Sequence, residues 1–159
     1  MKNWKLILAI LTANVVLMAA GYTMLIPFLP MYLMNELGVS AGDVKMWNGA
    51  IFSITFLIGG IMAPIWGKMA DTRGKKMMAV RAGAGLALSY FLGGIVTTPE
   101  QMFGVRVLQG FAAGLWSACL AIATSLVPME KLGVSLGIMQ AGLTCGNVIG
   151  PLVGGSLAT

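Results

Sequence analysis

The sequence predicts an all-α membrane protein with about five transmembrane helices. Hydrophobic residues make up 58% of the 159 residues and charged residues only 9%, whereas soluble domains average about 25% charged residues. The few charges lie between apolar runs, and each run is long enough for a helix to span a hydrocarbon core of about 30 Å. A chain of this composition buries its apolar surface in lipid.

The first apolar run extends from about residue 6 to residue 34 and predicts the first span. A signal peptide is the alternative, because Lys2 and Lys5 precede an apolar stretch that contains Ala-Ala-Gly, but the run continues past that site. We therefore favour an uncleaved span. Near its end, Pro27 and Pro30 lack backbone donors and predict a bend or an end of the helix.

Four further apolar runs predict the remaining helices. They cover about residues 46–66, 77–97, 101–126 and 132–158. The second and third are joined by a predicted loop, residues 67–76, which is termed the basic segment. It holds four of the ten Lys and Arg residues and one of the five acids. Its glycines, Gly67 and Gly74, allow a tight turn between antiparallel helices.

Lys and Arg are distributed unevenly over the two sides of this five-helix arrangement. One side holds Lys2, Lys5, Lys68, Arg73, Lys75, Lys76, Arg81 and Lys131. The other side holds only Lys45. The positive-inside rule therefore predicts a cytoplasmic N-terminus and a cytoplasmic basic segment. We expect the membrane to be the cell's inner (cytoplasmic) membrane. We expect Arg81 to extend to this interface and Trp66 to belong to its aromatic belt.

Arg106 lies about one turn inside the fourth predicted helix, where a charge does not easily reach an interface. Burying it costs a few kcal/mol even on lenient insertion scales, so we favour a function over outward snorkelling. Gln109 and Gly110 follow at one-turn spacing and put an amide and a bare backbone patch beside the guanidinium. The three residues predict a polar cleft.

The fifth predicted helix carries a smooth face of glycines. They recur at Gly142, Gly146, Gly150 and Gly154, and Gly155 follows. Such spacing lets another helix approach closely. Pro151 cannot bond to the carbonyl of Asn147 and so predicts a kink. Plain helix packing explains the glycines in part, while the kink predicts a hinge or a seal.

Four stretches carry a resemblance to the major facilitator superfamily. Gly67-x-x-Ala-Asp71-x-x-Gly74-Lys75-Lys76 resembles its cytoplasmic loop motif, and Arg106-x-x-Gln109-Gly110 resembles its fourth-helix motif. Gly146-x-x-x-Gly150-Pro151-x-x-Gly154-Gly155 resembles its fifth-helix antiporter motif, and Gly21-x5-Pro27-x-x-Pro30 the first-helix signature of its drug:proton antiporter branch. The chain looks most like bacterial multidrug efflux transporters, and the fifth-helix motif favours an exporter.

The resemblance implies alternating access, in which two six-helix halves rock about a central site and proton influx drives drug exit. It implies that Asp71 and Arg73 belong to a charge network at the cytoplasmic ends. Arg106 would take part in proton coupling, and Gly150 with Pro151 would seal the fifth helix against the partner half.

This chain ends in the fifth predicted helix, so we expect residues 1–159 to form a partial N-terminal transmembrane domain. The implied partners are the C-terminal half, a small amphipathic substrate, protons and the bilayer. No acid lies inside a predicted span, so the proton-carrying carboxylate is Asp71, lies in the missing portion, or is absent. Asn14 and Trp116 are candidates for substrate contact because they are polar or aromatic near mid-span.

Two other functions stay open at this point. One is an uptake symporter for a sugar or metabolite, and the other, if 159 residues is the complete product, is a non-transporting membrane protein that associates through the fifth helix. An enzyme has little support, because there is no histidine, nucleophile–base pair or phosphate loop. We expect no cofactor, no metal and no nucleic-acid partner, because Cys119 and Cys145 lack ligand spacing and the basic residues form no soluble face.

Overall fold

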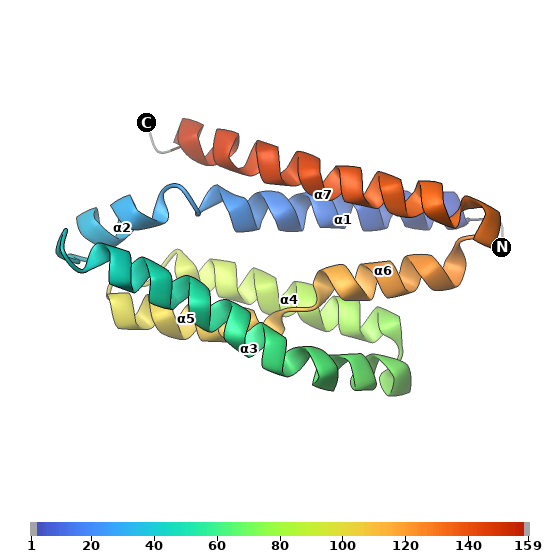
Figure 1. Cartoon of the computed structure of the whole chain (residues 1–159), viewed down its shortest axis with the longest axis horizontal. Helices are drawn as coiled ribbons and strands as arrows, with labels where there is room; N and C mark the ends of the chain where they lie inside the picture. Colours follow the sequence, from blue (N-terminus) through green and yellow to red (C-terminus); the bar gives the residue numbers. More distant parts are fainter. Residues whose placement is uncertain (1–2, 158–159) are drawn as a thin grey trace. The chain divides into compact units, whose positions relative to one another are not determined.

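The protein is described by a computed structural model over residues 3–157, and it is built from helices. In chain order these are α1 (Trp4–Met24), α2 (Leu29–Asn35), α3 (Val44–Arg73), α4 (Lys75–Gly93), α5 (Pro99–Ala112), α6 (Leu115–Leu126) and α7 (Met129–Leu157) (Figure 1). No strand occurs between residues 3 and 157. The predicted all-α fold is thereby confirmed.

Four stretches of the described chain are long and apolar enough to cross a membrane. They are Trp4–Met24, Val44–Arg73, Pro99–Leu126 and Met129–Ser156. The remaining predicted span, residues 77–97, corresponds to α4 and is not one of these four. Lys75, Lys76 and Arg81 lower the hydropathy of its N-terminal half, which explains why composition alone does not single it out.

The first predicted span, residues 6–34, consists of two helices, α1 and α2. The predicted effect of Pro27 is confirmed, because the helix stops just before it and the backbone turns. The N–H of Ile26 donates to the Thr23 carbonyl at 3.2 Å, and the N–H of Phe28 donates to the Leu25 carbonyl at 3.2 Å. Both bonds close three-residue turns in place of the α-helical spacing.

The predicted loop at residues 67–76 is wrong in its extent, because α3 continues through Arg73 and α4 begins at Lys75. Met69 and Ala70 are good helix formers, and a single glycine at 67 costs the helix only about 1 kcal/mol, so the helix persists through the charged residues. Gly74 alone separates the two helices. Its φ is 92°, which favours glycine, and its N–H donates to the Ala70 carbonyl at 3.1 Å.

The fourth predicted helix, residues 101–126, is interrupted at Ala113 and Gly114, where α5 ends and α6 has not yet begun. Gly114 has a φ of 109°, a value that residues with a Cβ rarely adopt. The fifth predicted helix, by contrast, starts earlier than expected and passes through Pro151 without interruption, as α7.

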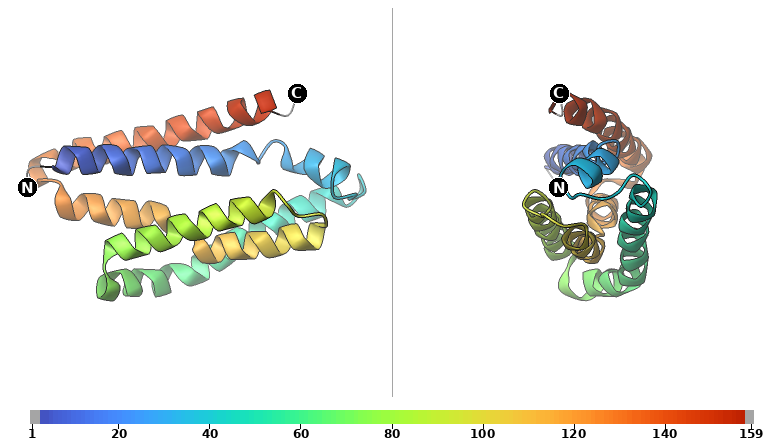
Figure 2. Two further views of the ribbon diagram at one scale, coloured as in Figure 1. Left: turned by 180° about the vertical axis from the view of Figure 1, so that it is seen from behind. Right: turned by 90° about the vertical axis from the view of Figure 1, so that its left-hand side faces the viewer.

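The described residues fall into two compact units. The first combines residues 3–28 with residues 119–157, and its main contact is between α1 and α7. Figures 1 and 2 show these two helices running side by side in the same direction. Parallel packing of the first and last span is what an alternating path through a bilayer produces.

The second unit, residues 29–118, contains α2, α3, α4 and α5. In it α5 packs against both α3 and α4, and α2 packs against the start of α3. A cluster of buried side chains joins these elements: Leu29, Leu33, Leu37, Val39, Val44, Ile51 and Met102. The Tyr32 hydroxyl also donates to the Val96 carbonyl at 3.3 Å, which ties α2 to the turn between α4 and α5.

Candidate functional site

A buried polar pair, one charged side chain and one amide, lies inside the second unit. Arg106 is 3% exposed and Gln109 is 4% exposed, and the Arg106 Nη1 donates to the Gln109 Oε1 at 3.0 Å. The snorkelling alternative for Arg106 is therefore wrong in this structure, because the guanidinium turns to its own helix and is removed from the surface. Burial of a charge is costly unless it is hydrogen-bonded, so the amide of Gln109 offsets part of that cost.

The local sequence explains how α5 carries this pair. Thr98 caps the helix by accepting a bond from the Gln101 N–H at 3.3 Å, and Pro99 occupies the first turn, where its missing N–H is not needed. From this start, the 3.6-residue repeat brings residues 106 and 109 onto the buried side of α5. The expected position of the Gln109 amide beside the Arg106 guanidinium is confirmed by their hydrogen bond.

Two residues of α3 also contact Arg106. The Phe52 ring centroid lies 5.5 Å from the guanidinium carbon, within the range of a cation–π contact. The Thr55 hydroxyl is shared between the Ile51 carbonyl at 3.0 Å and the Arg106 carbonyl at 3.3 Å. The sequence interpretation missed both residues, because they are about fifty positions away in the chain.

The sequence predicted that Gly110 lines a polar cleft, and this prediction is wrong. Gly110 is buried against α3, and a Cβ added there would lie 2.6 Å from the Thr55 carbonyl oxygen and 2.9 Å from the Ile58 Cβ. Its role in the structure is close helix approach. The Gln109 Nε2 is left buried without a hydrogen-bond partner among residues 3–157, so a polar donor stays available beside the guanidinium.

This arrangement has a defined chemical capacity. An arginine side chain cannot release its proton in the accessible pH range, so Arg106 is a fixed positive charge inside apolar helices. Such a charge attracts a carboxylate or another anion and raises the cost of bringing a second cation near it. The pair can therefore hold a carboxylate that titrates, but it cannot carry the proton itself.

The motif of the basic segment is helical apart from Gly74. Gly67 and Asp71 belong to the last turns of α3, and Lys75 and Lys76 form the first turn of α4. Asp71 and Arg73 are exposed, and no ion pair joins them within the described part of the chain. A local Asp71–Arg73 pair, one of the two partners considered for this acid, is therefore not formed here.

The fifth-helix motif is packed within the first unit. Gly146, Gly150 and Gly154 of α7 contact α1, so the glycine face is already covered by a helix of the same unit. At Gly146 an added Cβ would lie 2.7 Å from the Ala19 Cβ, and at Gly154 it would lie 2.7 Å from the Met24 carbonyl oxygen. Gly155 is less crowded, with Phe28 at 3.6 Å.

The other predicted site residues lie apart from the buried pair. Gly21 is part of α1, while Pro27 and Pro30 flank the start of α2. Asn14 is exposed on α1, and its side-chain amide donates to the Ile10 carbonyl of the same helix at 3.0 Å. Trp116 is half-buried in the first turn of α6. Asn14 and Trp116 belong to different units.

A second polar node was not anticipated. Arg81 donates to the carbonyl oxygens of Phe111, at 3.2 Å, and Ala113, at 3.0 Å, and Trp66 donates its indole N–H to the Phe111 carbonyl at 2.9 Å. The carbonyls are those that the end of α5 leaves without helical partners. Arg81 was expected at a lipid interface and Trp66 in an aromatic belt, and both expectations miss this contact.

Helices of spanning length, with a hydrogen-bonded charge buried among them, define a multi-pass membrane protein that keeps a polar site in its interior. The sequence profile of the Major Facilitator Superfamily matches residues 11–159. The chain belongs to this family.

Individual relatives point in the same direction. The chain is 39% identical over 157 residues to the multidrug resistance protein MdtG of Yersinia enterocolitica, covering 98% of this chain and 38% of the relative. It is 38% identical over 158 residues to the multi-drug resistance efflux pump PmrA homolog of Lactococcus lactis, covering 98% of this chain and 38% of the relative. The "Uncharacterized MFS-type transporter YuxJ" of Bacillus subtilis is 39% identical over 140 residues, with 88% and 36% covered. The chain thus spans less than two fifths of the length of these relatives.

Proposed function

We propose that the chain is the N-terminal part of a secondary transporter that exports amphipathic drugs in exchange for protons, by alternating access. The observation that carries this proposal is the buried pair of Arg106 and Gln109 within a chain of the Major Facilitator Superfamily. Two of the relatives are named for multidrug resistance or efflux, which supports drugs as the substrate class.

Proton coupling is assigned to Arg106, Gln109 and Gly110. The five acids of the chain, Glu36, Asp43, Asp71, Glu100 and Glu130, all lie in terminal turns of helices or between helices. The group that carries the proton is then Asp71 or a carboxylate of the remaining transporter. Arg106 would hold such a carboxylate in its charged form, and protonation would release it. Gly110 lets α3 support the pair from one side.

Gating is assigned to the ends and faces of the helices. Asp71 and Arg73 would form ion pairs with the C-terminal half in one conformation only, and Gly67, Gly74, Lys75 and Lys76 would position them. Because α1 covers the glycines of α7, the two helices would move as one element. Gly150 and Pro151 would help to seal α7 against the C-terminal half. Asn14 and Trp116 are the proposed substrate contacts.

The proposed orientation places the N-terminus and the basic segment in the cytoplasm, and the transporter in the cytoplasmic membrane. Within the second unit, the junction of α3 and α4, which holds the basic segment, lies at one end, and the start of α3, whose first turn includes Lys45, lies at the other (Figure 1). The uneven distribution supports this orientation under the positive-inside rule.

A reconstitution experiment tests the function. The full-length transporter would be placed in proteoliposomes with an imposed pH gradient, and movement of a fluorescent amphipathic drug would be followed. We expect drug movement opposite to the proton gradient, collapsing when the gradient is dissipated. Gradient-independent behaviour with every drug tested would overturn the coupling. Gradient-driven uptake of a labelled sugar or metabolite would instead indicate the symporter.

The role of Arg106 has its own readout. Arg106→Lys keeps the charge but loses the planar fork that bonds Gln109, so gradient-driven transport should fall about 100-fold, equivalent to about 2.8 kcal/mol. Drug exchange without a gradient should persist, because exchange needs binding and rocking but no proton transfer. Lys131→Arg, at an exposed turn, is the matched control. If Arg106→Lys lost gradient-driven transport and drug exchange equally, Arg106 would be needed for drug binding or folding and not for proton coupling.

A further inference from the structure

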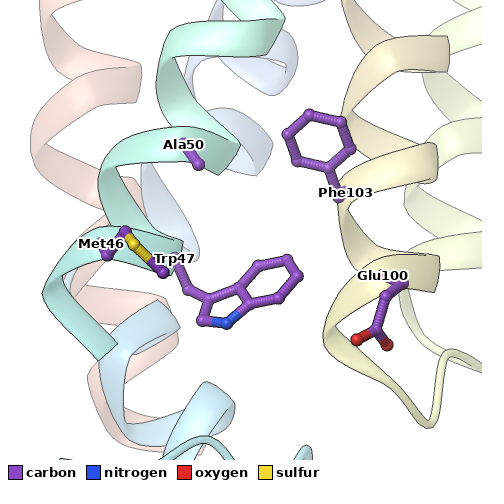
Figure 3. A pocket seen from close by; sticks show the side chains of 5 residues that line it. All are labelled: Met46, Trp47, Ala50, Glu100 and Phe103. Carbon is purple, nitrogen blue, oxygen red and sulfur yellow. The ribbon is translucent and has the colours of Figure 1, made fainter. Parts of the chain in front are cut away.

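The second unit has a pocket at the end remote from the basic segment. It has a volume of about 350 Å³ and lies between the first turns of α3 and α5. Its lining residues are Met46, Trp47, Ala50, Glu100 and Phe103 (Figure 3). The volume is at the lower end of the range of small-molecule sites, about 300–1,000 Å³.

The lining is almost wholly apolar, with two aromatic rings, and Glu100 is its one acidic residue. Figure 3 shows the indole of Trp47 and the ring of Phe103 reaching into the space between α3 and α5, from opposite helices. The Glu100 carboxylate lies one turn before Phe103, at the mouth of the same space. Met46 and Ala50 add flexible and small apolar surface. Aromatic faces beside a carboxylate are the groups that recognise organic cations.

The charges near the pocket favour a cation. Glu36, Asp43 and Glu100 lie at this end of the unit together with one cation, Lys45, which gives a net charge of −2 from three acids and one base. Glu100 forms neither a hydrogen bond nor an ion pair with any residue from 3 to 157, so its charge is not neutralised by Lys45. An acid in the first turn also suits the helix dipole of α5, by about 0.3–1 kcal/mol, but that preference does not explain two aromatic rings beside it.

The two aromatic rings of the pocket are held in place by buried side chains on the side away from the pocket. Trp47 and Phe103 pack against the buried cluster that includes Val44, Ile51 and Met102. Their rings therefore lose little further freedom when a ligand binds, and a preorganised wall reduces the entropic cost of binding. The Arg106 site, by contrast, presents a fixed positive charge, which opposes the binding of a second cation.

We propose that this pocket binds an amphipathic organic cation, such as a quaternary ammonium or phosphonium ion. The apolar groups of the ligand lie against Met46, Ala50 and the two rings, and its charge lies near Glu100 and over an aromatic face. The site is separate from the buried pair of Arg106 and Gln109, and binding at it requires neither a proton gradient nor transport.

Photolabelling in the full-length protein tests the site. A benzophenone derivative of triphenylphosphonium would be irradiated with the protein in lipid nanodiscs, without a gradient, and labelled peptides would be identified by mass spectrometry. We expect labels on residues 46–50 or 100–103. A benzophenone derivative of tetraphenylborate, similar in shape and opposite in charge, is the matched probe and should label this region at least about tenfold less.

Two variants distinguish the charge from the rings. Glu100→Gln should reduce phosphonium labelling of the pocket about tenfold, which corresponds to about 1.4 kcal/mol. Trp47→Leu should reduce it similarly while keeping Glu100. Glu36→Gln removes an acid of the same end that does not line the pocket, and should change labelling less than about twofold.

Three results would overturn the proposal. The first is equal labelling of the pocket by the borate probe, and the second is unchanged phosphonium labelling in both Glu100→Gln and Trp47→Leu. The third is the absence of label from the starts of α3 and α5, which is expected if the rest of the transporter fills the pocket. Each can be observed whether or not the protein pumps drugs, so this test and the transport test fail independently.

Discussion

The guanidinium carbon of Arg81 lies 3.8 Å from the centroid of the Trp66 ring, and both side chains donate to the carbonyl oxygen of Phe111. Trp66 also meets the Phe111 ring edge-on, with the ring centroids 5.0 Å apart. α3 and α4 thus both bind the end of α5 at the Phe111 carbonyl. The contact fixes the point at which the fourth span breaks, next to Gly114.

Arg81→Lys tests this contact without changing the charge that orients the helix. Lysine cannot reach the Phe111 and Ala113 carbonyls with a planar fork or stack on Trp66 in the same way, so we expect a loss of about 1–3 kcal/mol of stability. Thermal unfolding of the purified protein in detergent measures it. Arg73→Lys, at an exposed position, should leave the melting temperature unchanged. Equal melting temperatures for the two variants would contradict the contact.

Gly110→Ala tests close packing beside the buried pair. The new Cβ would meet the Thr55 carbonyl and Ile58 at less than 3 Å, and neither backbone nor Cβ can turn away, so we expect destabilisation of about 1–3 kcal/mol. Gly104→Ala on the same helix is the control, because no atom lies within 4 Å of its added Cβ. Unfolding of both in the same detergent gives the comparison. A Gly110→Ala protein as stable as Gly104→Ala would show that α3 and α5 separate more easily than the structure implies.

Gly146→Ala tests the contact of α7 with α1. Its Cβ would lie 2.7 Å from the Ala19 Cβ and 3.2 Å from the Ala20 nitrogen, so the helices must move apart, at a cost of about 1–3 kcal/mol. Gly137→Ala, where the added Cβ meets nothing within 4 Å, should be neutral or slightly stabilising. Cross-linking between cysteines introduced in α1 and α7 reports the separation directly. Undiminished cross-linking in Gly146→Ala would argue against this packing.

Asp71→Asn tests the proposed gating role of the basic segment. Removing an acid from a positive segment favours the same orientation, so insertion and expression should be unchanged. If Asp71 pairs with the C-terminal half in one conformation, losing a pair worth about 1.4 kcal/mol shifts the conformational balance about tenfold and reduces transport accordingly. Drug efflux from cells expressing equal amounts of protein measures this. Glu130→Gln is the control, and normal efflux by Asp71→Asn would leave the segment with a role in orientation alone.

Sequence patterns were sufficient where the determining interactions are local. The apolar runs identify the helices, Pro27 explains the end of α1, and the three-residue spacing of Arg106 and Gln109 places both on one side of α5. Each run is one continuous stretch of sequence, and the other two features depend on residues within about one helical turn. The family motifs added a functional interpretation that composition alone does not contain.

The errors concern contacts between residues far apart in the chain. Gly110 was interpreted as part of an open cleft because its neighbour on α3, Thr55, lies 55 positions earlier. The hydrogen bond of Arg81 to Phe111 was not predicted because Phe111 follows 30 positions later. The pocket at Trp47 and Glu100 depends on how α3 and α5 align, which no local pattern determines. The extent of the basic segment was misjudged for another reason, since charge suggested a loop where helix propensity prevails.

The single-residue junction at Gly74 has a consequence for proteolysis. Trypsin cuts after Lys and Arg, and the basic segment offers it Lys68, Arg73, Lys75 and Lys76 on an exposed part of the chain. Proteases act on mobile loop tips, however, and here the backbone is helical up to Arg73 and again from Lys75. Cleavage therefore requires the end of α3 or the start of α4 to unwind first. The rate of tryptic nicking at this junction becomes a direct measure of local opening on the charged side of the protein.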